Sequence, residues 1–284
     1  MRNPLRYPGA KSKLFDYVKK LIETEELRGC TFYEPFAGSA TLSWQLLEDG
    51  IIENAVINEK DPLLYHFWNS VFNYTEELIE LITNTEINIE TWNECAKYKE
   101  LAFLLGKNSY QIGFAALFLN RTNFSGILKA NPIGGKKQES NYKLDCRFNK
   151  EKIIKSILDI SKYKNNVKVF NDDAIEFMRK ELKYKRNRCT FVYIDPPYYK
   201  EGPGLYRYYY SDNQHKKLAD FIKSKKFPWL LSYDDTPEIR KLYNRRTCIN
   251  LYLDYSVKTS KKGKEVLISD LEIPPMEQEK VLVG

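Results

Sequence analysis

A tetrapeptide in the last third of the chain, Asp195-Pro196-Pro197-Tyr198, brings together groups that could hold a flat substrate. It follows residues 190–194, a run of β-branched, aromatic and aliphatic side chains that predicts a buried strand. Two prolines end this strand because neither has an N–H to donate, and the carboxyl ends of such strands bind ligands in open α/β sheets. Asp195 offers a carboxylate, Pro196 a carbonyl that no neighbouring strand is expected to use, and Tyr198 an aromatic face. The set suits a planar substrate whose amino group presents two N–H bonds to two acceptors.

A second candidate site is a glycine turn near the N-terminus. The predicted strand 31–34 leads into the turn 35–39, where Ser39 is expected to cap the following helix. A glycine such as Gly38 lets the backbone approach a ligand closely at a helix N-terminus. Glu59 ends the next predicted strand about 20 residues after Gly38, the spacing at which an acid binds ribose hydroxyls in nucleotide-binding folds. Because the turn lacks a G-x-G-x-x-G pattern, a ligand with ribose and adenine but no pyrophosphate is favoured.

The elements that must position these groups alternate between strand and helix. Predicted strands cover 31–34, 55–58, 167–170, 190–194 and 229–233, predicted helices cover 39–50, 173–182 and 214–225, and 247–253 with 265–270 form a final antiparallel pair. Residues 62–119 have helical apolar spacing, and residues 120–148 are polar with glycines and basic side chains. We therefore predict a Rossmann-like α/β sheet, in a catalytic domain of residues 1–60 plus 150–284, with residues 61–149 as an inserted, mainly helical subdomain.

Composition narrows the classes of function. The 284 residues are 43% hydrophobic, which argues against a disordered chain, and the first residues lack the apolar region of a secretory signal. Five scattered cysteines without a C-x-x-C pair are expected to be free thiols in a reducing cytosol, and two histidines without clustered ligands argue against a metal site. A net charge of +7 and an aromatic content of 14% favour a polyanionic partner with bases to stack on.

The motifs, taken in order, resemble the Dam-type DNA adenine-N6 methyltransferases that use S-adenosylmethionine. The matching segments are Leu5–Lys11 for the family's Leu-Lys-Trp-x-Gly-Gly-Lys element, Tyr33–Ala40 for its Pro-Phe-x-Gly-Ser-Gly turn, Asn58–Asp61 for its ribose-binding acid, Asn120–Gly126, Asp195–Tyr198 for its catalytic tetrapeptide, and Leu231–Asp234. This chain departs from the family at Tyr7, which replaces Trp, at Pro8-Gly9-Ala10, which replaces a Gly-Gly pair, and at Ala40, which replaces a glycine.

The resemblance implies methyl transfer from S-adenosylmethionine to the N6 atom of an adenine that is flipped out of double-stranded DNA. It implies roles in catalysis for Asp195, Pro196 and Tyr198, and DNA contacts for Arg6, Arg121 and Asn123. The residues that it implies in cofactor binding are Tyr7, Lys11, Phe36, Gly38, Ser39, Glu59, Asp172 and Asp195, with Asp173 as the alternative to Asp172. Lys136, Lys137 and Gln138 in the inserted loop are expected to reach DNA too, either as base readers or as phosphate contacts. The segment 198–210 is expected either to close over the DNA or to cover the sheet.

Other functions remain open at this level. A related enzyme could methylate cytosine N4 or RNA, and a protein-glutamine methyltransferase would also use such a corner but would not need the basic insert. A non-catalytic DNA-binding module is opposed by the intact Asp195, Pro196 and Tyr198. We expect a cytoplasmic monomer, with a cognate restriction endonuclease as a candidate partner.

Overall fold

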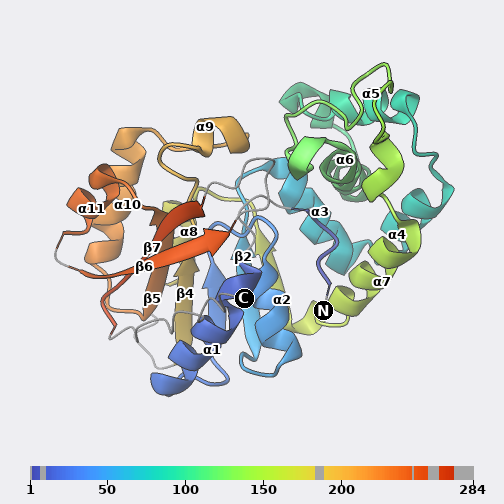
Figure 1. The fold of residues 1–284 in the computed structure, drawn as a ribbon. Helices are drawn as coiled ribbons and strands as arrows, with labels where there is room; N and C mark the ends of the chain where they lie inside the picture. Colours follow the sequence, from blue (N-terminus) through green and yellow to red (C-terminus); the bar gives the residue numbers. More distant parts are fainter. Residues whose placement is uncertain (1, 7–10, 183–188, 245, 255–261, 272–284) are drawn as a thin grey trace, which may run out of the picture.

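The computed structural model describes residues 2–6, 11–182, 189–244, 246–254 and 262–271, and its centre is a seven-stranded sheet (Figure 1). The strands are β1 (Thr31–Glu34), β2 (Asn54–Asn58), β3 (Val167–Phe170), β4 (Thr190–Ile194), β5 (Trp229–Asp234), β6 (Thr247–Asp254) and β7 (Lys262–Ser269). Their order is β3-β2-β1-β4-β5-β7-β6. All neighbours pair in parallel except β7, which is antiparallel to both β5 and β6. The predicted Rossmann-like α/β fold is confirmed.

The strand order reverses between β1 and β4, and this reversal creates the place where such sheets bind ligands. Thr31 pairs with Thr190, so the two strands run in register and end at the same edge of the sheet. The turn after β1 and the Asp195 corner after β4 therefore lie beside each other. β7 contributes to this edge as well, because its early residue Glu265 pairs with Asp234 at the end of β5.

Two groups of helices surround the sheet. The first comprises α1 (Phe15–Thr24), α2 (Thr41–Glu48), α8 (Ala174–Glu181), α9 (Gly202–Leu205), α10 (Asp212–Lys223) and α11 (Pro237–Leu242). The second, which we call the helical body, comprises α3 (Pro62–Asn73), α4 (Thr75–Asn84), α5 (Ile89–Lys97), α6 (Ser109–Thr122) and α7 (Lys150–Ser161), and it lies beside the sheet in Figure 1. Short 3₁₀ helices occupy Ser12–Leu14, Leu101–Leu104, Phe124–Gly126, Leu144–Arg147 and Lys164–Asn166.

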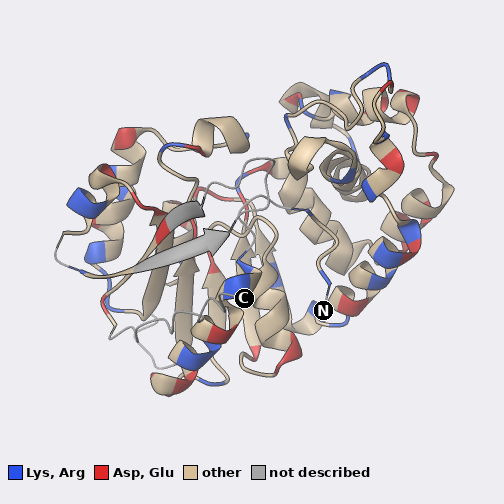
Figure 2. Cartoon of the chain, in the orientation of Figure 1, with Lys and Arg blue, Asp and Glu red and all other residues tan. Residues whose placement is uncertain are grey.

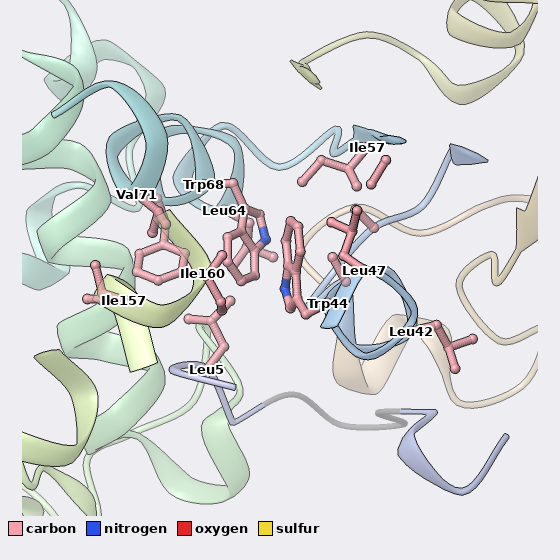
Figure 3. Close-up of a cluster of buried hydrophobic side chains, with 14 of the residues drawn as sticks. Leu5, Leu42, Trp44, Leu47, Ile57, Leu64, Trp68, Val71, Ile157 and Ile160 are labelled. Atoms are coloured by element: carbon pink, nitrogen blue, oxygen red, sulfur yellow. The ribbon is translucent and has the colours of Figure 1, made fainter. Parts of the chain in front are cut away.

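The helical body and one face of the sheet share a continuous hydrophobic core. Trp44 of α2 meets Trp68 of α3 with ring centroids 4.8 Å apart, and Figure 3 shows Leu5 and Ile160 beside this pair. Helix α6 is buried along most of its length because the other helices of the body pack around it. The division of the chain at residues 61 and 149 stays a prediction, although α3 and α7 begin next to these positions.

The start of α2 differs from the expected cap. The residue before the helix is Ala40, whose φ of 46° is left-handed, and the Ser39 side chain makes no capping bond. The Ser39 carbonyl instead accepts hydrogen bonds from Asn3 Nδ2 at 2.6 Å and from Trp44 Nε1 at 3.1 Å. Ser39 therefore helps to fix the turn through its backbone, and its prediction as a helix cap was wrong. Elsewhere the predicted elements match the observed ones to within a few residues, and no described helix is long and apolar enough to cross a bilayer.

Candidate active site

A cavity of about 240 Å³ lies at the edge where β1, β2 and β4 end. Of the residues predicted to act on substrate or cofactor, those that line the cavity are Lys11, Phe36, Gly38, Ser39, Glu59 and Asp195. Tyr7, also predicted, lies outside the described residues. The fold thus brings the glycine turn, the acid after β2 and the acid after β4 to one place.

The glycine turn is held against Glu59. Gly38 has a φ of +50°, and its N–H donates to Glu59 Oε2 at 2.9 Å, while its carbonyl accepts from Trp68 Nε1 at 2.8 Å. Glu59 Oε1 accepts from the N–H of Asp61 at 2.9 Å. Burial raises the pKa of Glu59 to about 7, and the two backbone donors oppose that rise. A carboxylate has about four acceptor sites, so Glu59 can still accept from ligand hydroxyls.

Asp61, just beyond Glu59, organises the same side of the cavity. Its carboxylate accepts from the N–H of Leu63 at 3.0 Å, which caps α3, and lies 3.3 Å from Arg207 Nη1. Arg207 also donates to the carbonyl of Lys99 at 2.8 Å. Because Lys99 lies just after α5, this contact ties the segment after α9 to the helical body.

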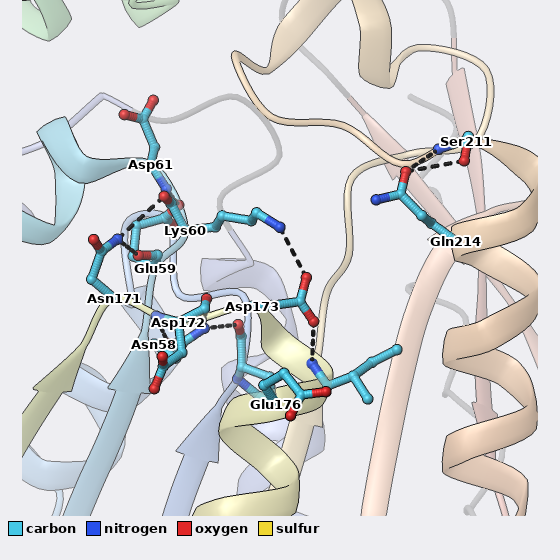
Figure 4. Close-up of polar contacts among 12 residues, drawn as sticks. Asn58, Glu59, Lys60, Asp61, Asn171, Asp172, Asp173, Glu176, Ser211 and Gln214 are labelled. Carbon is cyan, nitrogen blue, oxygen red and sulfur yellow. Dashed lines mark hydrogen bonds and ion pairs between the residues drawn. The ribbon is translucent and has the colours of Figure 1, made fainter. Parts of the chain in front are cut away.

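The two further predicted acids, Asp172 and Asp173, make contacts within the protein, and Figure 4 shows those of Asp173. Asp173 accepts from the N–H of Ile175 at 3.0 Å, which caps α8, and pairs with Lys60 Nζ at 2.9 Å. Asp172 pairs with Lys180 at 3.2 Å. Neither carboxylate is among the groups that line the cavity. The prediction that Asp172 contacts the cofactor is therefore not supported, because the chain turns its side chain toward α8.

The corner after β4 presents two acceptors that no residue in the described part of the chain uses. Asp195 Oδ1 accepts from Ser232 Oγ at 2.6 Å and lies 3.2 Å from Lys11 Nζ. Among the described residues no donor reaches Asp195 Oδ2, and none reaches the carbonyl of the buried Pro196. Tyr193 extends this network, since its hydroxyl is 2.8 Å from Ser232 Oγ. The corner can thus accept two N–H bonds from one bound group.

Tyr198 occupies a different place from the one expected. Its side chain is buried, and its ring is not among the groups that line the cavity. Its hydroxyl donates to Glu265 Oε1 and accepts from Lys11 Nζ at 2.7 Å. Stacking of a base on this ring would need the segment that follows it to move.

The segment from Tyr206 to Tyr210 forms one wall of the cavity. The ring of Tyr210 meets that of Phe36 edge-on, with centroids 5.6 Å apart. Lys129 Nζ, from the inserted loop, donates to the carbonyls of Pro203 and Tyr206. The segment 198–210 therefore covers the site and contacts the insert.

The residues expected to touch DNA fall into two groups. Lys136 and Lys137 are exposed, as a phosphate contact requires. Arg121 is half-buried: its Nε donates to the carbonyl of Pro4 at 2.6 Å, and burial, helped by the charge of Arg6, lowers its pKa to about 10. Arg6 is held by its backbone, which exchanges two hydrogen bonds with the Asn120 amide, each 2.7 Å long.

Asn123, also predicted as a DNA contact, uses its side chain inside the protein in this structure. Its side chain is fully buried, accepts from Trp92 Nε1 at 2.7 Å, and donates to the carbonyls of Ile127 and Leu128. Gln138 is used in a similar way, because its amide binds three backbone groups of its own loop. Both residues shape the inserted loop from within.

Several cavity residues were missed by the sequence analysis, namely Glu34, Thr41, Tyr193 and Gln214. Glu34 could have been found, because it directly precedes the glycine turn in the sequence. Burial raises its pKa to about 8. Thr41 and Tyr193 each lie two residues from a predicted site residue, whereas Gln214 comes from a segment that only the tertiary fold brings to the site.

The donor set fits S-adenosylmethionine. Glu59 has acceptors of the kind that ribose hydroxyls need, and Asp195 has a carboxylate of the kind that a sulfonium cation favours. Phe36 and Tyr210 offer aromatic surface of the kind that an adenine ring stacks on. The described residues include no group of three or more His, Cys, Asp or Glu side chains that could hold a metal ion.

The comparisons with known proteins point to the same chemistry. A family model for the D12 class N6 adenine-specific DNA methyltransferases matches residues 7–257. The type II methyltransferase M1.LlaDCHI of Lactococcus lactis subsp. cremoris is 25% identical over 282 residues, which are 93% of this chain and 94% of that protein. The type II methyltransferase M.CviBI of Paramecium bursaria Chlorella virus NC1A is 23% identical over 86% of this chain and 87% of its own length. Among solved structures, a candidate RNA methyltransferase of Pyrococcus horikoshii aligns over 93% of this chain and 83% of its own, with 10% identity and a TM-score of 0.41.

Proposed function

Because the chain belongs to the D12 class of N6 adenine-specific DNA methyltransferases, we propose that Asp195 and the Pro196 carbonyl hold the amino group of the target adenine. The protein transfers a methyl group from S-adenosylmethionine to adenine N6 in DNA. The observation that carries the residue assignment is the pair of unused acceptors at this corner, Asp195 Oδ2 and the Pro196 carbonyl. Two N–H bonds of one amino group match two neighbouring acceptors.

The chemistry explains why such a pair is needed. The lone pair of adenine N6 is delocalised into the ring, so the nitrogen is a weak nucleophile until it becomes more tetrahedral. Acceptors that are fixed before the substrate arrives stabilise the positive charge that develops on this nitrogen. Ser232 and Lys11 fix Asp195 by holding its other oxygen. When bound, the cofactor supplies a methyl group that its sulfonium already activates.

The target base must leave the double helix to reach this corner, because a stacked base hides its N6 atom from a buried site. The tyrosines between 206 and 210 form the wall through which it would enter. In this proposal Tyr198 becomes a stacking surface only after that wall has moved.

For the cofactor, we assign the ribose hydroxyls to Glu59 and the aromatic wall at Phe36 to the adenine ring. Gly38 and Ser39, with the start of α2, would face the methionine part, because a helix N-terminus favours a carboxylate. Lys11 would contact the cofactor from the side of the cavity that carries Asp195.

For the partners, Lys136 and Lys137 are proposed as phosphate contacts, and Arg121 is proposed to read a base with the part of its guanidinium that Pro4 does not use. The type II names of two relatives suggest that a cognate restriction endonuclease accompanies this protein. We further propose that it works as a monomer in the cytoplasm, where it meets DNA.

The assignment of the corner is tested by Asp195→Ala. We expect a folded protein in which transfer of labelled methyl groups to DNA is abolished, because the main acceptor is gone. The matched control is Asp235→Asn, in the loop after β5, whose carboxylate pairs with Arg240 away from the cavity. The control should retain full activity. Activity of Asp195→Ala within a few-fold of wild type would overturn the assignment.

A further inference from the structure

Glu265 is a buried carboxylate that directly precedes three buried apolar residues in β7. It is 2% exposed, and its neighbours Val266, Leu267 and Ile268 are fully buried in the core. A buried carboxylate destabilises a fold unless partners compensate for the lost water. The register of β7 places Glu265 opposite Asp234, at the edge of the sheet that carries the active site.

The partners of Glu265 are the two residues that also define the corner. Its Oε1 accepts from the Tyr198 hydroxyl and lies 3.4 Å from Lys11 Nζ. Lys11 Nζ is in turn 2.7 Å from the Tyr198 hydroxyl and 4.9 Å from the centroid of its ring. The same ammonium lies 3.2 Å from Asp195 Oδ1. One ammonium group is thus shared between two carboxylates and a phenol.

We propose that Glu265 is a positioning residue for methyl transfer, which acts on the reacting groups through Lys11 and Tyr198. This inference rests on the proposed role of Asp195. Glu265 draws the Lys11 ammonium to one side, so that it contacts Asp195 Oδ1 and leaves Oδ2 to the substrate amine. It also fixes the Tyr198 hydroxyl, and with it the backbone that carries the Pro196 carbonyl.

Loss of Glu265 should therefore change geometry at atoms that Glu265 does not touch. Without it, the attraction of Asp195 for the Lys11 ammonium would no longer be opposed by Glu265, and the ammonium would move toward Oδ2. Tyr198 would lose the acceptor for its hydroxyl. A displacement of this kind slows the chemical step more than it weakens binding, because the cofactor and DNA contacts made elsewhere are unchanged.

The experiment compares Glu265→Leu, which preserves volume, with Glu265→Gln, whose amide oxygen can still accept from Tyr198. We expect Glu265→Leu to lower kcat by about tenfold or more, while KM for S-adenosylmethionine and for DNA stays within about threefold. Glu265→Gln should recover part of the loss. The matched control is Ser269→Ala, which removes a buried hydrogen bond to the Trp229 carbonyl at the far end of the same strand. It should lower the melting temperature without lowering kcat.

A double-mutant cycle with Tyr198→Phe identifies the route of the effect. If Glu265 acts through Tyr198, the loss caused by Glu265→Leu shrinks when the hydroxyl is already absent. Equal losses in both backgrounds, or a folded Glu265→Leu protein with wild-type kcat, would overturn the proposal. Should the leucine variant fail to fold, the same cycle is run with Glu265→Gln, and an additive result overturns the proposal again. A fully active Asp195→Ala variant is a separate outcome, which removes the proposed role of Asp195 itself.

Discussion

At the scale of single residues, Glu59 shows how the fold prepares a group before any ligand binds. Its two oxygens accept from the N–H groups of Gly38 and Asp61, yet burial raises its pKa to about 7. Near neutral pH the side chain is therefore divided between its protonated and ionised forms. Ribose hydroxyls donate better to the ionised form, so a ligand that binds there should lower this pKa and release a proton.

We predict that affinity for S-adenosylmethionine rises with pH between 6 and 8. Below a pKa near 7 most Glu59 is protonated and above it most is ionised, so the affinity should rise by about tenfold over this interval. Glu59→Gln should flatten this dependence and weaken binding at pH 8 by about 1.5–3 kcal/mol. Calorimetry at three pH values gives both quantities.

The control for this pH dependence is Glu34→Gln, because burial also raises the pKa of Glu34, to about 8. If the slope survives in Glu59→Gln and vanishes in the control, the ribose role does not belong to Glu59.

The sequence predicted those site residues whose role follows from a local pattern. Gly38, Glu59 and Asp195 each stand at a strand end that can be identified from a few neighbours. Glu265 could not be found in this way, because its importance depends on how β7 pairs with β5. Asn123 was assigned to DNA because its segment resembles a motif of the family, and only the fold reveals that its amide binds Trp92 and the loop backbone.

At the scale of elements, the strands were predictable because each is a short run of β-branched and aromatic side chains. Their order was not, since pairing between β1 and β4 joins residues that are far apart in the chain. The packing of the helices against one another could not be predicted from the sequence either. Helices α3 and α6 approach so closely that a Cβ added to Gly113 would lie 2.7 Å from the carbonyl oxygen of His66.

Gly113→Ala should therefore destabilise the protein. The added methyl meets backbone, which cannot move without shifting α3, so we expect a loss of about 1–3 kcal/mol in the free energy of unfolding. Urea denaturation measures it. In the control, Gly204→Ala, the new Cβ meets nothing within 4 Å, and alanine is the better helix former by up to about 1 kcal/mol. Equal stability of the two variants would contradict this account of the α3–α6 contact.

At the scale of the whole molecule, the N-terminal segment links the two halves of the fold. Asn3 Nδ2 donates to the Ser39 carbonyl in the glycine turn, and Arg121 Nε, at the end of α6, donates to the Pro4 carbonyl. The Asn120 amide, also in α6, fixes the backbone of Arg6 through two hydrogen bonds. The end of α6 and the glycine turn are thus attached to one short segment. Arg121 consequently has a structural role besides any contact with DNA, and its replacement should affect both.

The lysines of the inserted loop allow a test of DNA binding that, unlike replacement of Arg121, does not also disturb the fold. Lys136 and Lys137 are exposed, so Lys136→Ala combined with Lys137→Ala should leave stability unchanged. If both contact phosphates, binding weakens alike for every sequence, and the slope of log affinity against log salt falls by about 1.8. The matched control removes Lys162 and Lys164, which directly follow α7, a helix along which Figure 2 shows basic and acidic residues together. It changes the net charge of +7 by the same amount and should leave the slope unaltered.

Binding titrations at several salt concentrations, with methylation profiling of a random-sequence library, separate the outcomes. A change of preference at one base position would instead make one of the two lysines a base reader.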